Sequence, residues 1–143
     1  MARAKKKAAR PSGGAAAPMN PMAEQVGPDF YDVRAMADAL TAHDAEPVTP
    51  AELEERRTRH EVLGVRTADE QWIFPTWQVN DAVVLPGLDE VLTAFAGHPA
   101  WSVALWLRTP REELAERTPH EALVAGEIAS VVELAGVVAA RWA

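Results

Sequence analysis

The sequence predicts a mainly α-helical fold that contains one small β-hairpin. Apolar residues recur with the period of an α-helix in several separate segments. Two β-branched and aromatic runs, residues 62–67 and 71–77, flank the short stretch 68–70, which is the pattern of a hairpin. Three copies of Thr-Pro-x-Glu, a sequence typical of helix N-termini, add to the helical prediction.

The chain divides by charge into a basic N-terminal segment and an acidic remainder. Its 143 residues are the size of one ordinary domain. Residues 1–28 have almost nothing to bury, so we expect a disordered basic tail. Residues 1–10 carry +5, and since the net charge of the chain is −7, the remainder carries −12. Any general affinity for nucleic acid would begin in the tail and be opposed by the acidic remainder. A solubilising leader is the alternative interpretation of the tail.

Two helices are predicted before the hairpin. Apolar periodicity places the first over residues 32–42. The sequence TPAE from Thr49 has the form of a capping box, in which the threonine and the glutamate each accept a hydrogen bond from a backbone N–H, and it places the second helix over residues 50–60. A helix followed directly by a two-stranded wing is the arrangement of winged helix-turn-helix folds, where the second helix enters the major groove. We therefore expect residues 29–80 to form a short winged-helix-like region that binds DNA.

The candidate DNA contacts are basic side chains on the second helix, the hairpin and the tail. They are Arg56, Arg57, Arg59, Arg66, Lys5, Lys6 and Lys7. Arginines at these positions can contact phosphates or guanine edges. The three glutamates on the same helix favour the alternative, in which the arginines form ion pairs one turn apart on a solvated face.

Residues 81–143 predict a compact helical domain. An apolar stripe at the spacing of a helix covers residues 88–95. The Thr-Pro-x-Glu sequences at Thr109 and Thr118 each predict the start of a further helix. The last helix is expected over residues 127–142.

The last helix is apolar around most of its circumference. Its apolar stripe consists of Ile128, Val131, Val132, Ala135, Val138 and Trp142. Leu134 and Val137 add apolar surface outside this stripe. Because a surface helix of a monomer normally shows a clear polar half, we expect this helix to contact a second copy of the chain or another protein.

The sequence contains no recognisable catalytic constellation. The absence of cysteine excludes disulfides, cysteine-based zinc sites and a thiol nucleophile. The four histidines are far apart in the sequence, and neither a glycine-rich phosphate loop nor a serine nucleophile elbow occurs. We expect a protein that is not an enzyme and that needs no metal or cofactor. No apolar run is long enough to span a membrane, and the cytoplasm is the expected location.

Several C-terminal motifs occur in an order known from one protein family. They are the aromatic-rich segment 101–107, the Thr109-Pro110 break, the sequence RTPHEAL from Arg117, and Gly126-Glu127 followed by Val131. This block resembles the toxin-binding domain of Xre/MbcA/ParS-type antitoxins. The segment from Leu63 to Leu88 resembles the one that joins a DNA-binding region to that domain in actinobacterial members. The resemblance covers about residues 61–134. His120 departs from it, since the family usually has an aliphatic residue there.

The resemblance implies an antitoxin of a type II toxin-antitoxin system. Such a protein binds and occludes its cognate toxin, often of the RES type that degrades NAD⁺, and represses its own operon by binding operator DNA as a homodimer. Arg117, Thr118 and the apolar stripe of the last helix are then the expected toxin contacts. The alternative is a DNA-binding transcriptional regulator or architectural protein without a toxin, whose C-terminal domain only dimerises. An adaptor that binds protein alone is a third possibility.

Overall fold

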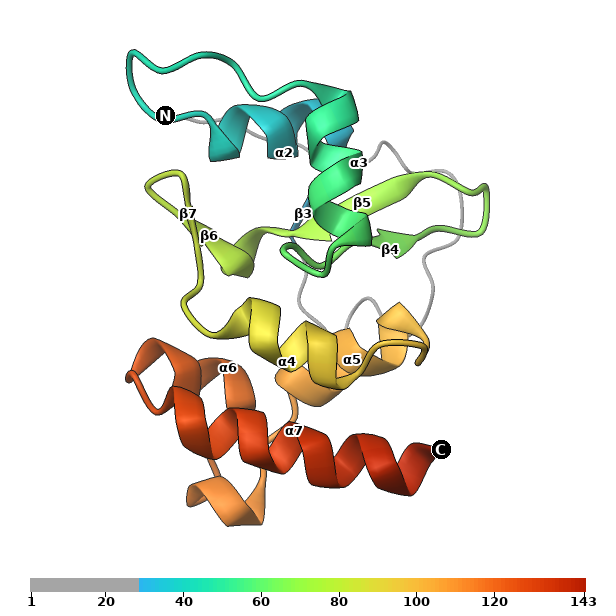
Figure 1. Cartoon of the computed structure of the whole chain (residues 1–143), viewed down its shortest axis with the longest axis vertical. Helices are drawn as coiled ribbons and strands as arrows, with labels where there is room; N and C mark the ends of the chain where they lie inside the picture. The colour runs from blue at the N-terminus through green and yellow to red at the C-terminus, as the bar shows by residue number, and fades with distance from the viewer. Residues whose placement is uncertain (1–28) are drawn as a thin grey trace.

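The computed structural model describes residues 29–143, which form two tiers (Figure 1). The upper tier holds α2, α3 and the strands, and the lower tier holds α4 to α7. The elements in chain order are β3 (Phe30–Tyr31), α2 (Val33–Leu40), α3 (Pro50–Thr58), β4 (Val65–Arg66), β5 (Trp72–Pro75), the 3-10 helix η1 (Thr76–Gln78), β6 (Val79–Asn80), β7 (Val83–Val84), α4 (Leu88–Ala94), α5 (Ala100–Leu107), the 3-10 helix η2 (Glu112–Leu114), α6 (Pro119–Val124) and α7 (Ile128–Trp142). The predicted mainly α-helical fold with a small β part is confirmed.

Strand β5 is the centre of a three-stranded antiparallel sheet with the order β3-β5-β4. The predicted hairpin is present, with Val65 opposite Ile73 and Arg66 opposite Trp72. On its other side β5 pairs with β3, which the sequence did not predict. A two-residue strand is too short to show alternation, and Tyr31 fitted the helical stripe that follows it. A separate small hairpin, β6–β7, pairs Val79 with Val84.

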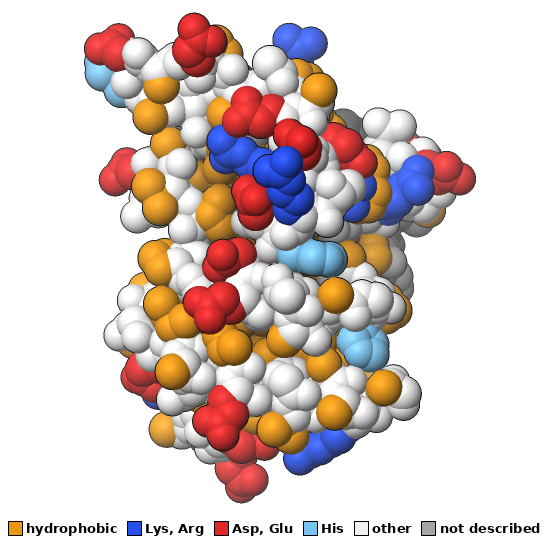
Figure 2. All heavy atoms as spheres, viewed as in Figure 1, with side chains coloured by type: hydrophobic (Ala, Val, Ile, Leu, Met, Phe, Trp, Pro, Cys, Tyr) orange, Lys and Arg blue, Asp and Glu red, His pale blue; other side chains and the backbone are white. Residues whose placement is uncertain are grey.

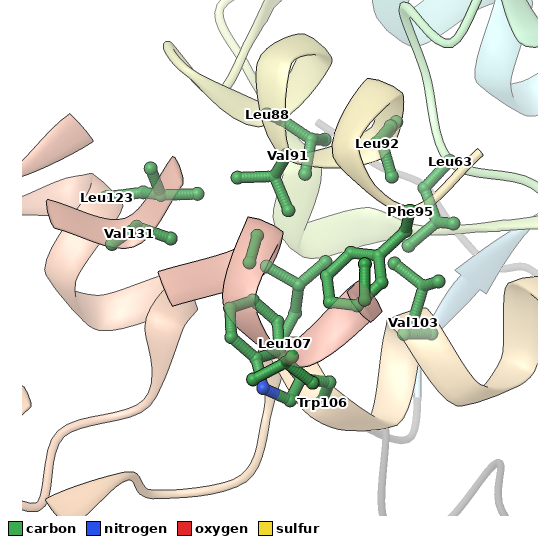
Figure 3. Close-up of a cluster of buried hydrophobic side chains, with 14 of the residues drawn as sticks. Leu63, Leu88, Val91, Leu92, Phe95, Val103, Trp106, Leu107, Leu123 and Val131 are labelled. Atoms are coloured by element: carbon green, nitrogen blue, oxygen red, sulfur yellow. The ribbon is translucent and has the colours of Figure 1, made fainter. Parts of the chain in front are cut away.

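The three-stranded sheet buries side chains on both of its faces. On one face Phe74 packs in a cluster with Met36, Leu40, Leu53 and Val62, most of which come from α2 and α3. On the other face Ile73, Val65, Phe30 and the adjacent Leu63 join the large cluster built from α4 to α7 (Figure 3). The domain boundary expected at residue 80 therefore does not separate two cores, because residues before and after it pack in the same hydrophobic cluster.

The Thr-Pro-x-Glu sequence at Thr118 forms a complete capping box. The Thr118 hydroxyl accepts a hydrogen bond from the Glu121 N–H at 3.0 Å, and the Glu121 carboxylate accepts one from the Thr118 N–H at 2.8 Å. At Thr49 only half of the box forms, because the hydroxyl caps the Glu52 N–H while the Glu52 carboxylate binds Arg56 instead. The same short sequence thus gives two different N-termini.

The third sequence, at Thr109, does not begin an α-helix, and that prediction is wrong. The Thr109 hydroxyl donates a hydrogen bond to the Leu105 carbonyl at 2.7 Å, so it serves the end of α5. The chain then forms the short η2 and turns back, and Arg111 pairs with Arg117 in an isolated antiparallel bridge. The backbone of Arg111 is extended, with φ −122° and ψ 135°, so no helical turn that needs a cap follows Thr109 and Pro110 directly.

Gly87 allows the start of α4 to approach the start of α7. Its φ of +89° lies in the left-handed region that favours glycine. A Cβ at this position would lie 2.7 Å from an Ile128 side-chain atom and 3.1 Å from one of Leu123. Any larger residue would separate these elements, because the contacting atoms belong to packed side chains.

Gln78 is a fully buried polar residue that connects segments 15 positions apart. Its Nε2 donates hydrogen bonds to the carbonyls of Leu63 at 2.8 Å and Pro75 at 3.1 Å. Its Oε1 accepts a hydrogen bond from the Leu63 N–H at 2.8 Å. The side chain therefore satisfies buried backbone groups that precede the hairpin, which otherwise would have no partner in the core.

We expect Gln78→Met to lower the free energy of unfolding by about 3 kcal/mol, because it leaves the buried Leu63 N–H and C=O without partners. Urea denaturation followed by circular dichroism measures this loss. The matched control is Gln71→Met, at an exposed glutamine between β4 and β5, which we expect to be nearly neutral. Equal effects from the two variants would contradict the role given to Gln78.

Candidate nucleic-acid and partner-binding surfaces

Helix α3 and the β4–β5 hairpin lie beside each other in the upper tier, away from α7 (Figure 1). The Trp72 ring of the hairpin connects them. The guanidinium carbon of Arg57 lies 3.8 Å from the Trp72 ring centroid, and that of Arg66 lies 5.2 Å from it. Both distances are within the range of cation–π attraction, so Trp72 holds basic side chains of the helix and the hairpin together.

Three of the arginines predicted to contact DNA lie in α3 or at its C-cap, and each of them is paired with a glutamate. The pairs are Arg56 with Glu52 at 2.9 Å, Arg57 with Glu54 at 2.5 Å and Arg59 with Glu55 at 3.0 Å. The hydrogen bond from Arg57 lowers the pKa of the Glu54 carboxyl, so this glutamate stays ionised. The ion pairs predicted from the sequence as the alternative to DNA contact are therefore present on α3. The three pairs sum to zero formal charge.

Arg59 and Arg66 are the most accessible of these four arginines. Their side chains are 62% and 49% exposed, while Arg57 is 21% exposed beneath its tryptophan and glutamate contacts. Figure 2 shows the resulting surface over α3, where red and blue side chains alternate. The remaining predicted DNA contacts, Lys5, Lys6 and Lys7, lie outside the described residues.

The hairpin is fixed to the helical tier by a hydrogen bond from α5. Trp101 Nε1 donates to the Arg66 carbonyl at 2.7 Å. The Trp101 ring also lies 6.0 Å from that of Phe30, on the neighbouring strand β3. The position of Arg66 therefore depends on the C-terminal helices as well as on the sheet.

The apolar stripe of α7 belongs mainly to the core of this chain, which corrects its expected role as a partner contact. Val131, Ala135 and Val138 are buried in the large cluster, and Ile128 and Val132 are half-buried against it. Helices α4 and α6 are the main cover of this side of α7. Periodicity revealed the stripe but not how much apolar surface the rest of the chain offers to it.

Trp142 is also part of an intramolecular contact. Its ring centroid lies 5.0 Å from that of Phe95 and 5.6 Å from that of His98. This aromatic contact holds the end of α7 against the end of α4. An apolar residue near the end of α7 is thus explained without a partner.

Arg117 and Thr118, the other expected toxin contacts, both stabilise the turn before α6. The Arg117 guanidinium donates two hydrogen bonds to the Glu127 carboxylate, at 2.8 and 2.7 Å. This pairing raises the pKa of Arg117 and lowers that of Glu127. Thr118 caps α6, so both residues have a structural function within the chain.

A second aromatic and basic cluster joins η1 to the helical tier. The rings of Trp77 and His120 lie 4.9 Å apart, and the Arg108 guanidinium carbon is 5.5 Å from the Trp77 centroid. Burial lowers the pKa of His120, and the positive charge of Arg108 lowers it further. His120 therefore packs here as a neutral ring.

Residues 29–143 contain no group of three or more His, Asp or Glu side chains that could hold a metal ion. No helix within this range has the length and apolar character needed to cross a membrane.

Comparison with known proteins gives one structural similarity. No family model matches the chain, and no curated protein matches it. The chain is similar to the NMR structure of Rv2175c, with a TM-score of 0.64 and 22% identity over 78% of this chain and 81% of that one. At this level of identity the similarity supports the winged-helix-like fold alone.

We expect the stability of the protein to fall as the pH is lowered from about 6.5. The pKa of His120 is about 6.5 when unfolded and lower when folded, so the unfolded state binds more protons in this range. Stability from a neutral His120 is complete above pH 6.5 and is lost as the pH falls through the lower, folded-state pKa. Thermal unfolding across this range measures the loss.

His120→Leu should remove this part of the pH dependence, and His43→Leu, at an exposed histidine, should retain it. A pH dependence that is identical in wild type and His120→Leu would contradict the assignment to His120.

Proposed function

We propose that this protein binds double-stranded DNA through α3 and the β4–β5 hairpin. The observation that carries the proposal is their placement, since an exposed helix lies beside a short two-stranded wing. The accessible Arg59 lies at the end of the helix, and the accessible Arg66 lies on the wing. In winged helix-turn-helix proteins these two elements contact the major groove and the DNA backbone. The fold similarity supports this arrangement of elements but carries no function with it.

The ion pairs on α3 make its contribution to DNA affinity modest. Exposed pairs of this kind are worth roughly 0.2–1 kcal/mol, so a phosphate can replace a glutamate as the partner of an arginine. Because the three pairs sum to zero formal charge, α3 provides little long-range attraction. Residues 1–10, with their charge of +5, supply the larger electrostatic term, and binding depends strongly on salt.

Fluorescence anisotropy of a labelled duplex, at two or more salt concentrations, tests this proposal. We expect Arg59→Ala and Arg66→Ala each to weaken binding about fivefold and to reduce the salt slope by about 1, as for a lost phosphate contact. Arg34→Ala is the matched control, since Arg34 is exposed on α2, outside α3 and the hairpin. Removal of residues 1–10 should weaken binding further without abolishing the effect of Arg66→Ala.

Absence of DNA binding would overturn the proposal. So would wild-type affinity in both arginine variants, because binding would then come from the basic tail alone.

A second candidate function is that of an antitoxin that occludes a cognate toxin, as the sequence resemblance implies. The observation in its favour is Val124 at the end of α6, which is 64% exposed within the resembled segment. An apolar side chain this exposed is suited to a protein contact, although single exposed apolar residues are also common on monomers.

We expect Val124→Asp to weaken binding to the toxin about tenfold or more, measured by isothermal titration with the product of the neighbouring reading frame, including an RES-type product. Val83→Asp, at an equally exposed valine of β7, is the matched control. Unchanged binding by the Val124 variant would exclude this surface as the toxin contact.

A further inference from the structure

The outward side of α7 carries few charges for a helix at the surface. Its exposed residues are Ala129, Ser130, Glu133, Gly136, Val137, Ala140 and Arg141, with Trp142 at the helix end. Val137 lies in the middle of this outer face and is 46% exposed. The outer face is distinct from the buried stripe, since it points away from α4 and α6. A surface helix of a monomer normally has a polar face here.

Gly136 indicates that something approaches this outer face closely. Glycine in the interior of a helix destabilises it relative to alanine, so it needs a reason. At Gly136 no other described atom lies within 4 Å of the place where a Cβ would be, apart from the chain neighbours and the helix's own backbone. Packing within the described chain therefore does not require glycine, whereas the close approach of another helix would.

The two charges on the outer face are arranged symmetrically about Val137. Glu133 lies four residues before it and Arg141 four residues after it. Within residues 29–143 neither side chain forms an ion pair. If two copies of α7 pack antiparallel with Val137 at the two-fold axis, each Glu133 lies beside the partner's Arg141. Parallel packing would instead place like charges together.

We propose that the outer face of α7 binds the same face of a second copy of this chain, antiparallel and centred on Val137. The face is complementary to itself in charge, and Gly136 beside its centre lets the two helices approach closely. A helix of 15 residues is about 22 Å long, so the contact is small and the dimer dissociates reversibly. Because α7 lies in the other tier from α3 and the hairpin, this dimer leaves the proposed DNA interface accessible (Figure 1).

Exchange of the two charges tests the pairing in the full chain. Sedimentation equilibrium should show a concentration-dependent dimer for wild type. Glu133→Arg and Arg141→Glu should each raise the dimer dissociation constant about tenfold, because each places two like-charged pairs across the axis. The double variant restores both pairs and should return to within about threefold of wild type. Glu46→Arg, an exposed reversal outside α7, is the matched control and should leave the dimer unchanged.

A wild-type chain that stays monomeric at all concentrations would overturn the proposal. This is the result expected if the outer face binds only a different protein. Dimerisation that does not respond to the single reversals, or that the double variant fails to restore, would also overturn it. Since these side chains are exposed and unpaired within the described chain, the variants should fold as wild type does.

A single cysteine gives an independent measurement, because the chain has none of its own. Val137→Cys places two sulfurs at the two-fold axis and should form a disulfide-linked dimer under mild oxidation. Asp38→Cys, exposed on α2, should remain mostly uncrosslinked at the same concentration. Equal crosslinking of the two variants would contradict the position of Val137 at the two-fold axis.

Discussion

The buried Gln78 amide fixes the junction on which the rest of this structure depends. It binds both backbone groups of Leu63, at the point where the chain passes from α3 to the hairpin. Leu63 itself packs in the large cluster, whereas its neighbour Val62 packs in the small one. A buried amide is tolerated only when its hydrogen bonds are satisfied, and this requirement selects one register for the segment. The relative positions of α3, the hairpin and the helical tier follow from it.

Because the sheet is buried on both faces, the winged-helix-like part and the helical part form one structural unit. Ile73 and Phe74, adjacent on β5, belong to different clusters, as the alternation of a strand requires. The hydrogen bond from Trp101 to the Arg66 carbonyl adds a polar contact between the same two parts. A change in the helical tier is thus expected to alter the orientation of the hairpin. The proposed DNA interface depends on residues far from it in the sequence.

Local sequence patterns predicted most helices and the hairpin, because these depend on interactions a few residues apart. The capping box at Thr118 is an example, since all of its hydrogen bonds join residues of one turn. The same pattern failed at Thr109, whose hydroxyl binds back to α5. Whether a helix follows such a motif depends on the path of the whole chain, here the antiparallel pairing of Arg111 with Arg117, which a four-residue motif does not contain.

The burial of the candidate site residues was predicted less well than the fold, for a related reason. Periodicity identified the apolar stripe of α7, but Val131, Ala135 and Val138 proved to be covered by the chain itself. The outer face of α7 lies on the opposite side of the helix. Its Gly136 and the equal spacing of Glu133 and Arg141 about Val137 are visible in the sequence. On α3 the glutamates did signal the ion pairs correctly. The role of Gln78 had no sequence signal, since two of its three hydrogen bonds are to backbone groups 15 residues away.

We propose above all that α3 and the hairpin, held in place by the helical tier, form a DNA-binding surface. An NMR titration of the isotope-labelled full chain with duplex DNA tests this most directly. We expect the largest changes in amide chemical shift at residues 50–72 and little change in the middle of α7. Changes confined to residues 1–28 would contradict it, because binding would then need no folded surface.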